Sequence, residues 1–151
     1  MPLSANKKTY VSDKIRGLFS SYKNIQIPKL RNGVFEAALG PNGAGIFVTN
    51  LGTNGFLRWD AFYCAVDILD TNGQTNNGNA MNVKLGAPGL EIDKTIEGFL
   101  AFHVYGIVIG KSVFRRVTSI TGILRAANIA ESTTGAHQLT KGTMVDMKSI
   151  P

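Results

Sequence analysis

Three side chains of this 151-residue chain are suited to acid–base or nucleophilic chemistry: His103, His137 and Cys64. A histidine can act as a general base near neutral pH, and a cysteine acts as a nucleophile once its thiol is deprotonated. His103 stands between the apolar residues Phe102 and Val104, and no pattern of nucleophile, base and orienting residue accompanies either histidine. We therefore expect His103 to be a core or strand-face histidine, Cys64 to be a buried strand cysteine, and the chain not to be an enzyme. An enzyme that uses His103 or His137 is the third of three functional alternatives.

Motifs for metals and nucleotides are missing from the sequence. The two histidines are 34 positions apart and there is one cysteine, so neither Cys-x-x-Cys nor His-x-x-x-His spacing exists to hold zinc. The glycine-rich segment 40–45 (GPNGAG) lacks the Lys-Ser/Thr pair of a phosphate-binding Walker loop, and strand-like residues follow it. We expect no cofactor, no metal and no small-molecule substrate.

Positive charge is concentrated near the N-terminus. The net charge of the chain is +6. Residues 1–32 contain seven Lys and Arg residues against one Asp, whereas nine basic and nine acidic residues balance over 33–151. This distribution predicts a basic N-terminal arm (1–32) and a neutral β domain (33–151). Such an arm suits phosphate, anionic lipid or an acidic neighbour, although a solvated tail would have the same composition.

The arm is expected to make contacts through charge and through an apolar stripe. Residues 12–25 place apolar side chains at helical spacing, which predicts a short amphipathic helix. Its stripe would dock on a neighbouring subunit or cap the core of the domain itself. The expected charge contacts are Lys7, Lys8, Lys14, Arg16, Lys23 and Arg31, the expected docking residues are Ile15, Leu18, Phe19 and Tyr22, and the secondary basic contacts are Arg115 and Arg116.

Five Asn-Gly pairs and the apolar runs between them predict an all-β fold. Asn and Gly both tolerate the positive φ that tight hairpin turns require. Two polar segments, 70–80 and 130–136, are expected to be loops. β-Branched and aromatic residues predict strands over 34–39, 46–51, 56–69, 81–85, 95–109, 112–124 and 138–147. The expected architecture is a sandwich (jelly-roll-like) or a barrel of about 7–8 strands, preceded by the short N-terminal helix.

These features favour a structural assembly protein. The longest apolar run, 98–110, is shorter than the roughly 20 residues of a membrane span, so we expect no membrane partner. A basic arm before a neutral β domain resembles the layout of small viral coat proteins and bacteriophage virion components. The resemblance implies a coat, cement (decoration) or tail subunit, located in the virion after assembly in the host cytoplasm, that binds copies of itself or other virion subunits through the arm. The alternative is a single-stranded nucleic-acid-binding β-barrel that contacts nucleic acid through the arm.

Overall fold

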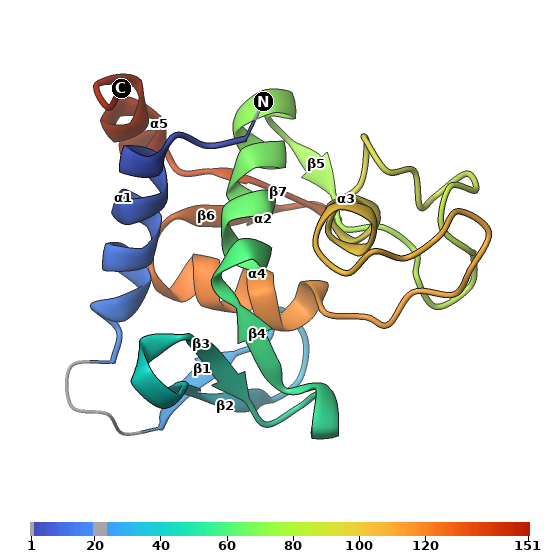
Figure 1. Ribbon diagram of the computed structural model, residues 1–151, viewed down its shortest axis with the longest axis horizontal. Helices are drawn as coiled ribbons and strands as arrows, with labels where there is room; N and C mark the ends of the chain where they lie inside the picture. The colour runs from blue at the N-terminus through green and yellow to red at the C-terminus, as the bar shows by residue number, and fades with distance from the viewer. Residues whose placement is uncertain (1, 20–23) are drawn as a thin grey trace.

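The computed structural model describes residues 2–19 and 24–151, and it shows a mixed α/β fold (Figure 1). The α-helices are α1 (Ala5–Arg16), α2 (Trp59–Asn72), α3 (Ile96–His103), α4 (Val117–Ala126) and α5 (Lys141–Lys148). The strands are β1 (Ile25–Pro28), β2 (Val34–Leu39), β3 (Gly45–Val48), β4 (Phe56–Arg58), β5 (Thr75–Asn76), β6 (Ala130–Thr133) and β7 (Ala136–Leu139). Two short 3-10 helices, η1 (Pro41–Gly43) and η2 (Gly52–Asn54), separate β2 from β3 and β3 from β4.

The expected all-β sandwich or barrel is wrong. The strands form two small antiparallel sheets, one of four strands in the order β1-β2-β3-β4 and one of three in the order β5-β7-β6. Neither sheet closes into a barrel within the part of the chain that the structure describes. In that same part, no helix combines the length and the apolar character that crossing a membrane requires.

Segments predicted as strands are helical where their buried residues recur at helical spacing. In α2 the side chains of Phe62, Val66 and Leu69 are buried on one face, three and four positions apart. In α4 the same spacing buries Ile120 and Ile123. These segments contain many β-branched and aromatic residues, which have a preference for strands. That preference is weak, and the burial of an apolar helical face outweighs it. The strand predictions for 56–69, 95–109 and 112–124 therefore fail over most of their length.

Other predicted elements are shifted or absent. The strand at 34–39 is confirmed as β2, and the strand at 46–51 is found one residue earlier and ends sooner, as β3. Turns occupy 81–85, and the end of the predicted strand 138–147 is α5. The two predicted loops contain structure as well: 70–80 holds the end of α2 and β5, and 130–136 is the β6–β7 hairpin.

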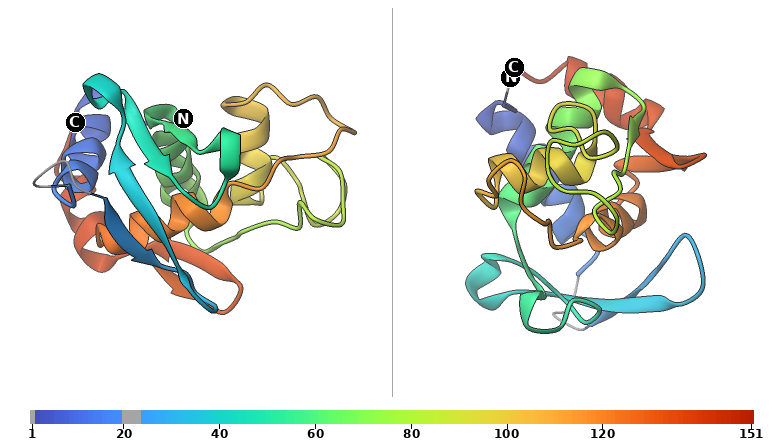
Figure 2. Two further views of the ribbon diagram at one scale, coloured as in Figure 1. Left: turned by 90° about the horizontal axis from the view of Figure 1, so that it is seen from below. Right: turned by 90° about the vertical axis from the view of Figure 1, so that its right-hand side faces the viewer.

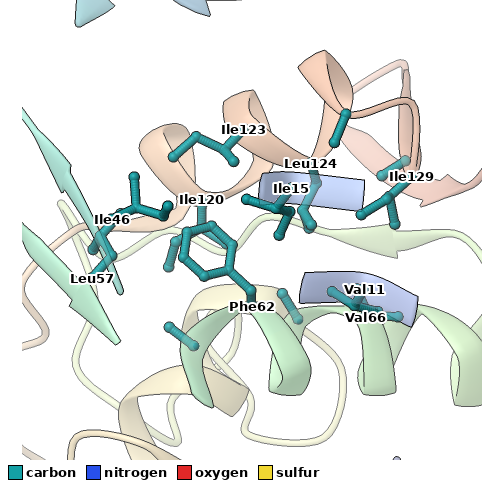
Figure 3. Packing of buried hydrophobic residues seen from close by; sticks show 14 of the residues in the cluster. Val11, Ile15, Ile46, Leu57, Phe62, Val66, Ile120, Ile123, Leu124 and Ile129 are labelled. Carbon is teal, nitrogen blue, oxygen red and sulfur yellow. The ribbon is translucent and has the colours of Figure 1, made fainter. Parts of the chain in front are cut away.

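The N-terminal helix forms earlier in the chain than predicted and packs on the body of the protein. Its Val11 and Ile15 side chains are fully buried and belong to the same core as Phe62 of α2 and Ile120 of α4 (Figure 3). The hydroxyl of Tyr10 donates a hydrogen bond to Asp146 of α5 at 2.8 Å, and Figure 1 shows α1 beside α5. The apolar stripe of α1 thus covers the core of its own domain.

Ser4 caps α1, and its removal should weaken the docked helix. The Ser4 side chain accepts a hydrogen bond from the backbone N–H of Lys7 at 3.3 Å. We expect Ser4→Ala to lower the free energy of unfolding by about 1 kcal/mol, because the N–H loses its partner. Urea denaturation measures this change. Ser132→Ala, at an exposed serine of β6, is the control, and an equal effect of both substitutions would contradict the capping role.

Two hairpin tips project from the same side of the molecule (Figure 2). The β1–β2 hairpin packs directly on α4, where Gly122 lets the helix approach: a Cβ at this position would lie 3.1 Å from the Phe35 ring and 3.3 Å from Ile27. The turn of the β6–β7 hairpin contains Gly135, which has a φ of 69°. The turn of the first hairpin and Gly135 line one pocket, so the two tips and α4 enclose a common space.

Candidate anion-binding site

The space between the two hairpin tips and α4 is a basic pocket of about 570 Å³. It is lined by four cationic residues (Lys29, Arg31, Arg115 and Arg125) and by Leu30, Asn32, Asn77, Thr118 and Gly135. Among these described lining residues there is no Asp, no Glu and no aromatic ring. A concave surface of one charge sign focuses its electrostatic field and attracts ions of the opposite sign. The pocket is therefore suited to an anion.

The β1–β2 turn presents two of the cations. The backbone N–H of Lys29 donates to the carbonyl of Gly33 at 3.0 Å, which closes the turn. Gly33 has a φ of 101°, a conformation that glycine adopts without strain, and the Asn32-Gly33 pair does mark a hairpin turn as the sequence predicts. Arg31 is exposed at this tip. Its guanidinium has no hydrogen bond or ion pair to another described residue, so it is available to a ligand.

A buried histidine orients two further donors at the base of the pocket. His137 is 0% exposed, and its Nε2 lies 2.9 Å from Nη1 of Arg125. Because a guanidinium only donates, Nε2 must accept, and the proton of the neutral ring sits on Nδ1. Nδ1 then donates to Oδ1 of Asn77 at 2.8 Å. Oδ1 of Asn77 therefore faces His137, and its amide nitrogen, which has no hydrogen bond to another described residue, remains as a donor for a ligand.

Burial and charge keep His137 neutral at physiological pH. Burial, and next the positive charge of Arg125, lower the pKa of His137 to about 4. Arg125 is held at a second point, since its Nη2 donates to the carbonyl of Pro28 in β1 at 3.3 Å. Burial lowers the pKa of Arg125 as well, yet a guanidinium stays protonated in proteins. Arg125 thus links β7, α4 and the β1–β2 hairpin while keeping its charge.

Glu97 of α3 fixes the start of α4, next to the pocket residues Arg115 and Thr118. Its Oε1 accepts hydrogen bonds from the backbone N–H groups of Arg116 at 2.9 Å and Val117 at 3.2 Å. Glu97 is 2% exposed, and burial raises its pKa to about 7, against the lowering effect of these N–H groups and of the charges of Arg116 and Arg115. This anchor holds the backbone from which Arg115 reaches the pocket.

The two adjacent arginines at the start of α4 have different roles. Arg115 is exposed and lines the pocket. The guanidinium of Arg116 lies 3.7 Å from the centroid of the Tyr105 ring and 4.9 Å from that of Phe114, a cation–π arrangement. Arg58 contacts the same Tyr105 ring at 5.4 Å. The sequence predicted both Arg115 and Arg116 as secondary basic contacts, and only Arg115 lies in the pocket.

The cations of α1 lie away from the basic pocket, and several rest on aromatic rings. Arg16 stacks on Trp59 at 4.8 Å and donates to the carbonyl of Gly43, Lys14 lies over Tyr10 at 5.5 Å, and Lys8 lies over Tyr63 at 5.6 Å. Lys7 is partly exposed on the same helix. Of the expected arm charges, the structure therefore places only Arg31 in the pocket; Lys23 lies outside the described residues.

The expected docking residues of the arm are turned toward the interior. Ile15 is fully buried, Phe19 is 4% exposed, and Leu18 is partly buried against the same core. Tyr22 lies outside the described residues. The apolar stripe therefore has a partner within its own chain.

A second pocket, of about 380 Å³, contains the residues that the sequence marked for nucleophilic chemistry. Cys64 of α2 and His103, the last residue of α3, both line it, together with Asp60, Asp67 and Lys8. Neither residue is on a strand, contrary to expectation. Burial raises the pKa of the Cys64 thiol, which is the opposite of the change that activates a cysteine. The His103 ring instead packs on Phe99, with ring centroids 4.4 Å apart.

Two features of the basic pocket were missed by sequence reasoning for different reasons. Lys29 and Arg31 come just before the Asn32-Gly33 turn signal, so a hairpin tip carrying two cations could have been read from the sequence. The Arg125–His137–Asn77 network has no local signal, because Asn77 and His137 are 60 positions apart. In the described part of the chain, no three His, Cys, Asp or Glu side chains come together as a metal site requires.

Comparison with known proteins returns no match: no protein-family model, no curated protein and no solved structure matches this chain. The geometry and charge of the basic pocket are what indicate a function.

Proposed function

We propose that this protein binds nucleic acid by its phosphate backbone, and that the basic pocket is the binding site. The observation that carries the proposal is that four cations from the two faces of one pocket converge without a carboxylate among the described lining residues. Lys and Arg that neutralise phosphates supply most of the affinity of a protein for nucleic acid, and hydrogen-bond donors to phosphate oxygens set its orientation.

Two donors of the pocket, those of Arg125 and Asn77, are oriented before a ligand arrives. His137 holds the guanidinium of Arg125 and the amide of Asn77, and it turns the side-chain oxygen of Asn77 toward itself. Arg31 and Arg115 extend from exposed positions on opposite sides. Preorganised donors bind more tightly because less side-chain entropy is lost on binding.

The sequence predicted nucleic-acid binding as the alternative function, with the N-terminal arm as the contact surface. We propose the same kind of ligand but a different surface, the basic pocket. A β-barrel no longer supports nucleic-acid binding, because that fold is wrong, and the cations of α1 rest largely on aromatic rings. The cations come instead from the β1–β2 turn, from Arg115 just before α4 and from Arg125 within α4. The role as a virion component, the virion location and self-association remain predictions, and the β-sandwich on which their argument depended is not the fold of this chain.

The salt dependence of binding tests the proposal. Fluorescence anisotropy would follow the binding of a labelled duplex and of a single strand between about 50 and 200 mM salt. If four phosphates are neutralised, the logarithm of the association constant falls with the logarithm of salt concentration with a slope of about −3 to −4. The Arg31→Ala/Arg115→Ala variant should bind at least about tenfold more weakly at low salt, and its slope should be shallower by about two.

A matched variant separates the pocket from the N-terminal helix. Lys7→Ala/Lys14→Ala removes the same charge from α1 and should leave the slope unchanged. The proposal fails if the wild-type protein shows no salt-dependent binding, or if both double variants change the slope equally. A loss of binding confined to the α1 variant would transfer the function to the helix α1.

A further inference from the structure

We infer that the ligand is duplex DNA. Leu30, at the tip of the β1–β2 hairpin, inserts into the minor groove of the duplex as an apolar wedge. This inference rests on the proposed function. Leu30 is 55% exposed and stands between Lys29 and Arg31. All three residues line the basic pocket. A large apolar side chain at an exposed turn contributes little to the fold, whereas flanked by two cations it suits a surface that meets both bases and phosphates.

On this face the β1–β2 turn presents an exposed apolar side chain to a bound duplex. Helix α4 lies between the two hairpin tips, but most of its side chains are buried and the β1–β2 hairpin covers it at Gly122. A helix with its side chains is about 10–12 Å wide and enters the major groove, whereas the minor groove is only about 6 Å wide. A two-stranded ribbon as a whole is likewise suited to the major groove, but the single exposed leucine side chain at its turn is small enough for the narrower groove. Proteins that bind there insert Leu, Phe, Ile, Met or Pro between base steps and kink the duplex.

The composition of the pocket favours a duplex over a single strand. Proteins that bind single strands without sequence preference stack the bases on aromatic side chains beside a positive groove. Among the described residues that line the basic pocket there is no aromatic ring. The neighbouring Tyr105 ring is already occupied by Arg116 at 3.7 Å. Cations without a stacking platform are typical of backbone contacts along a duplex.

DNA bending tests the inference directly. A duplex of about 30 base pairs with a donor and an acceptor dye at its two ends would report a bend of about 20–90° as increased energy transfer. The wild-type protein should increase the transfer, and Leu30→Ala should abolish the increase while keeping the salt slope. Leu30→Met, which retains a long apolar side chain, should still bend the duplex. The control is Val34→Ala, at a valine of the same hairpin that is 52% exposed and does not line the pocket.

The outcomes separate the inference from the proposed function. A duplex that is bound with the expected salt slope but stays straight, or that Leu30→Ala bends as the wild type does, overturns the wedge while nucleic-acid binding stands. Tighter binding of the single strand than of the duplex overturns the inference in the same way. If no nucleic acid is bound at any salt concentration, the proposed function fails and the inference falls with it.

Discussion

Replacing Glu97 with Gln should stabilise this protein at pH 8 by about 1–3 kcal/mol. At this pH the wild-type carboxyl, 2% exposed, is ionised, because its pKa is about 7. Gln keeps an oxygen that accepts from the backbone N–H groups of Arg116 and Val117, and it has no charge to desolvate. The hydrogen bonds that begin α4 are therefore preserved while the cost of burying the charge is removed.

The stabilising effect of Glu97→Gln at pH 8 follows from how the contribution of Glu97 to the free energy of unfolding changes with pH. Glu97 has a pKa of about 7 in the folded protein, above its ordinary value of 4.5. The folded state therefore holds the proton more tightly, and this stabilisation is complete below pH 4.5 and is lost as the pH rises through 7. Glu97→Gln should remove this decrease in the free energy of unfolding with rising pH. Urea denaturation at a series of pH values measures it.

Glu97→Ala serves as the contrasting variant. It leaves two backbone N–H groups without their acceptor in a buried place and opens a cavity, so we expect a loss of about 2–4 kcal/mol at every pH. A Gln variant that is as unstable as the Ala variant at pH 8 would show that the negative charge itself holds the start of α4, and the prediction would be wrong.

The second large effect is expected at His137. His137→Phe conserves a ring but removes both nitrogens, which leaves Arg125 without one of its acceptors and Asn77 without its donor. We expect a loss of about 3 kcal/mol in the free energy of unfolding at pH 7, and weaker nucleic-acid binding because two donors of the pocket lose their orientation. Urea denaturation and fluorescence anisotropy measure the two effects.

His137→Gln is the matched variant, because its oxygen can accept from Arg125 and its amide can donate to Asn77. It should recover much of both the stability and the affinity. Equal losses for Phe and Gln would indicate that ring packing matters and the hydrogen bonds do not, and this would remove the positioning role of His137.

Glu97 and His137 make opposite contributions to the pH profile. His137 has a pKa of about 4 in the folded protein, below its ordinary value of 6.5. Its contribution to stability is present above pH 6.5 and is lost as the pH falls toward 4. In the wild-type protein the two slopes oppose each other between pH 4.5 and 6.5. The Glu97→Gln variant should therefore become more stable as the pH rises across this window, and His137→Gln should become less stable.

Several features of this protein follow from the sequence alone because their cause is local. The strand at 34–39 and the Asn32-Gly33 turn depend on neighbouring residues, and both are present in the fold. The existence of an N-terminal helix follows from its apolar spacing, although the helix begins at Ala5. The excess of positive charge over 1–32 is a matter of composition, and two of its seven basic residues, Lys29 and Arg31, reach the basic pocket.

The tertiary structure decided the fold class and the site, because both depend on what covers each face of an element. The β-branched residues of α4 resemble a strand in isolation, but the packing of its Ile120 stripe against α2 and of Gly122 against Phe35 favours a helix. The pocket likewise joins Asn77, Arg125 and His137 from separate elements. No local pattern brings them together, because the energy that does so is the burial of the core beneath them.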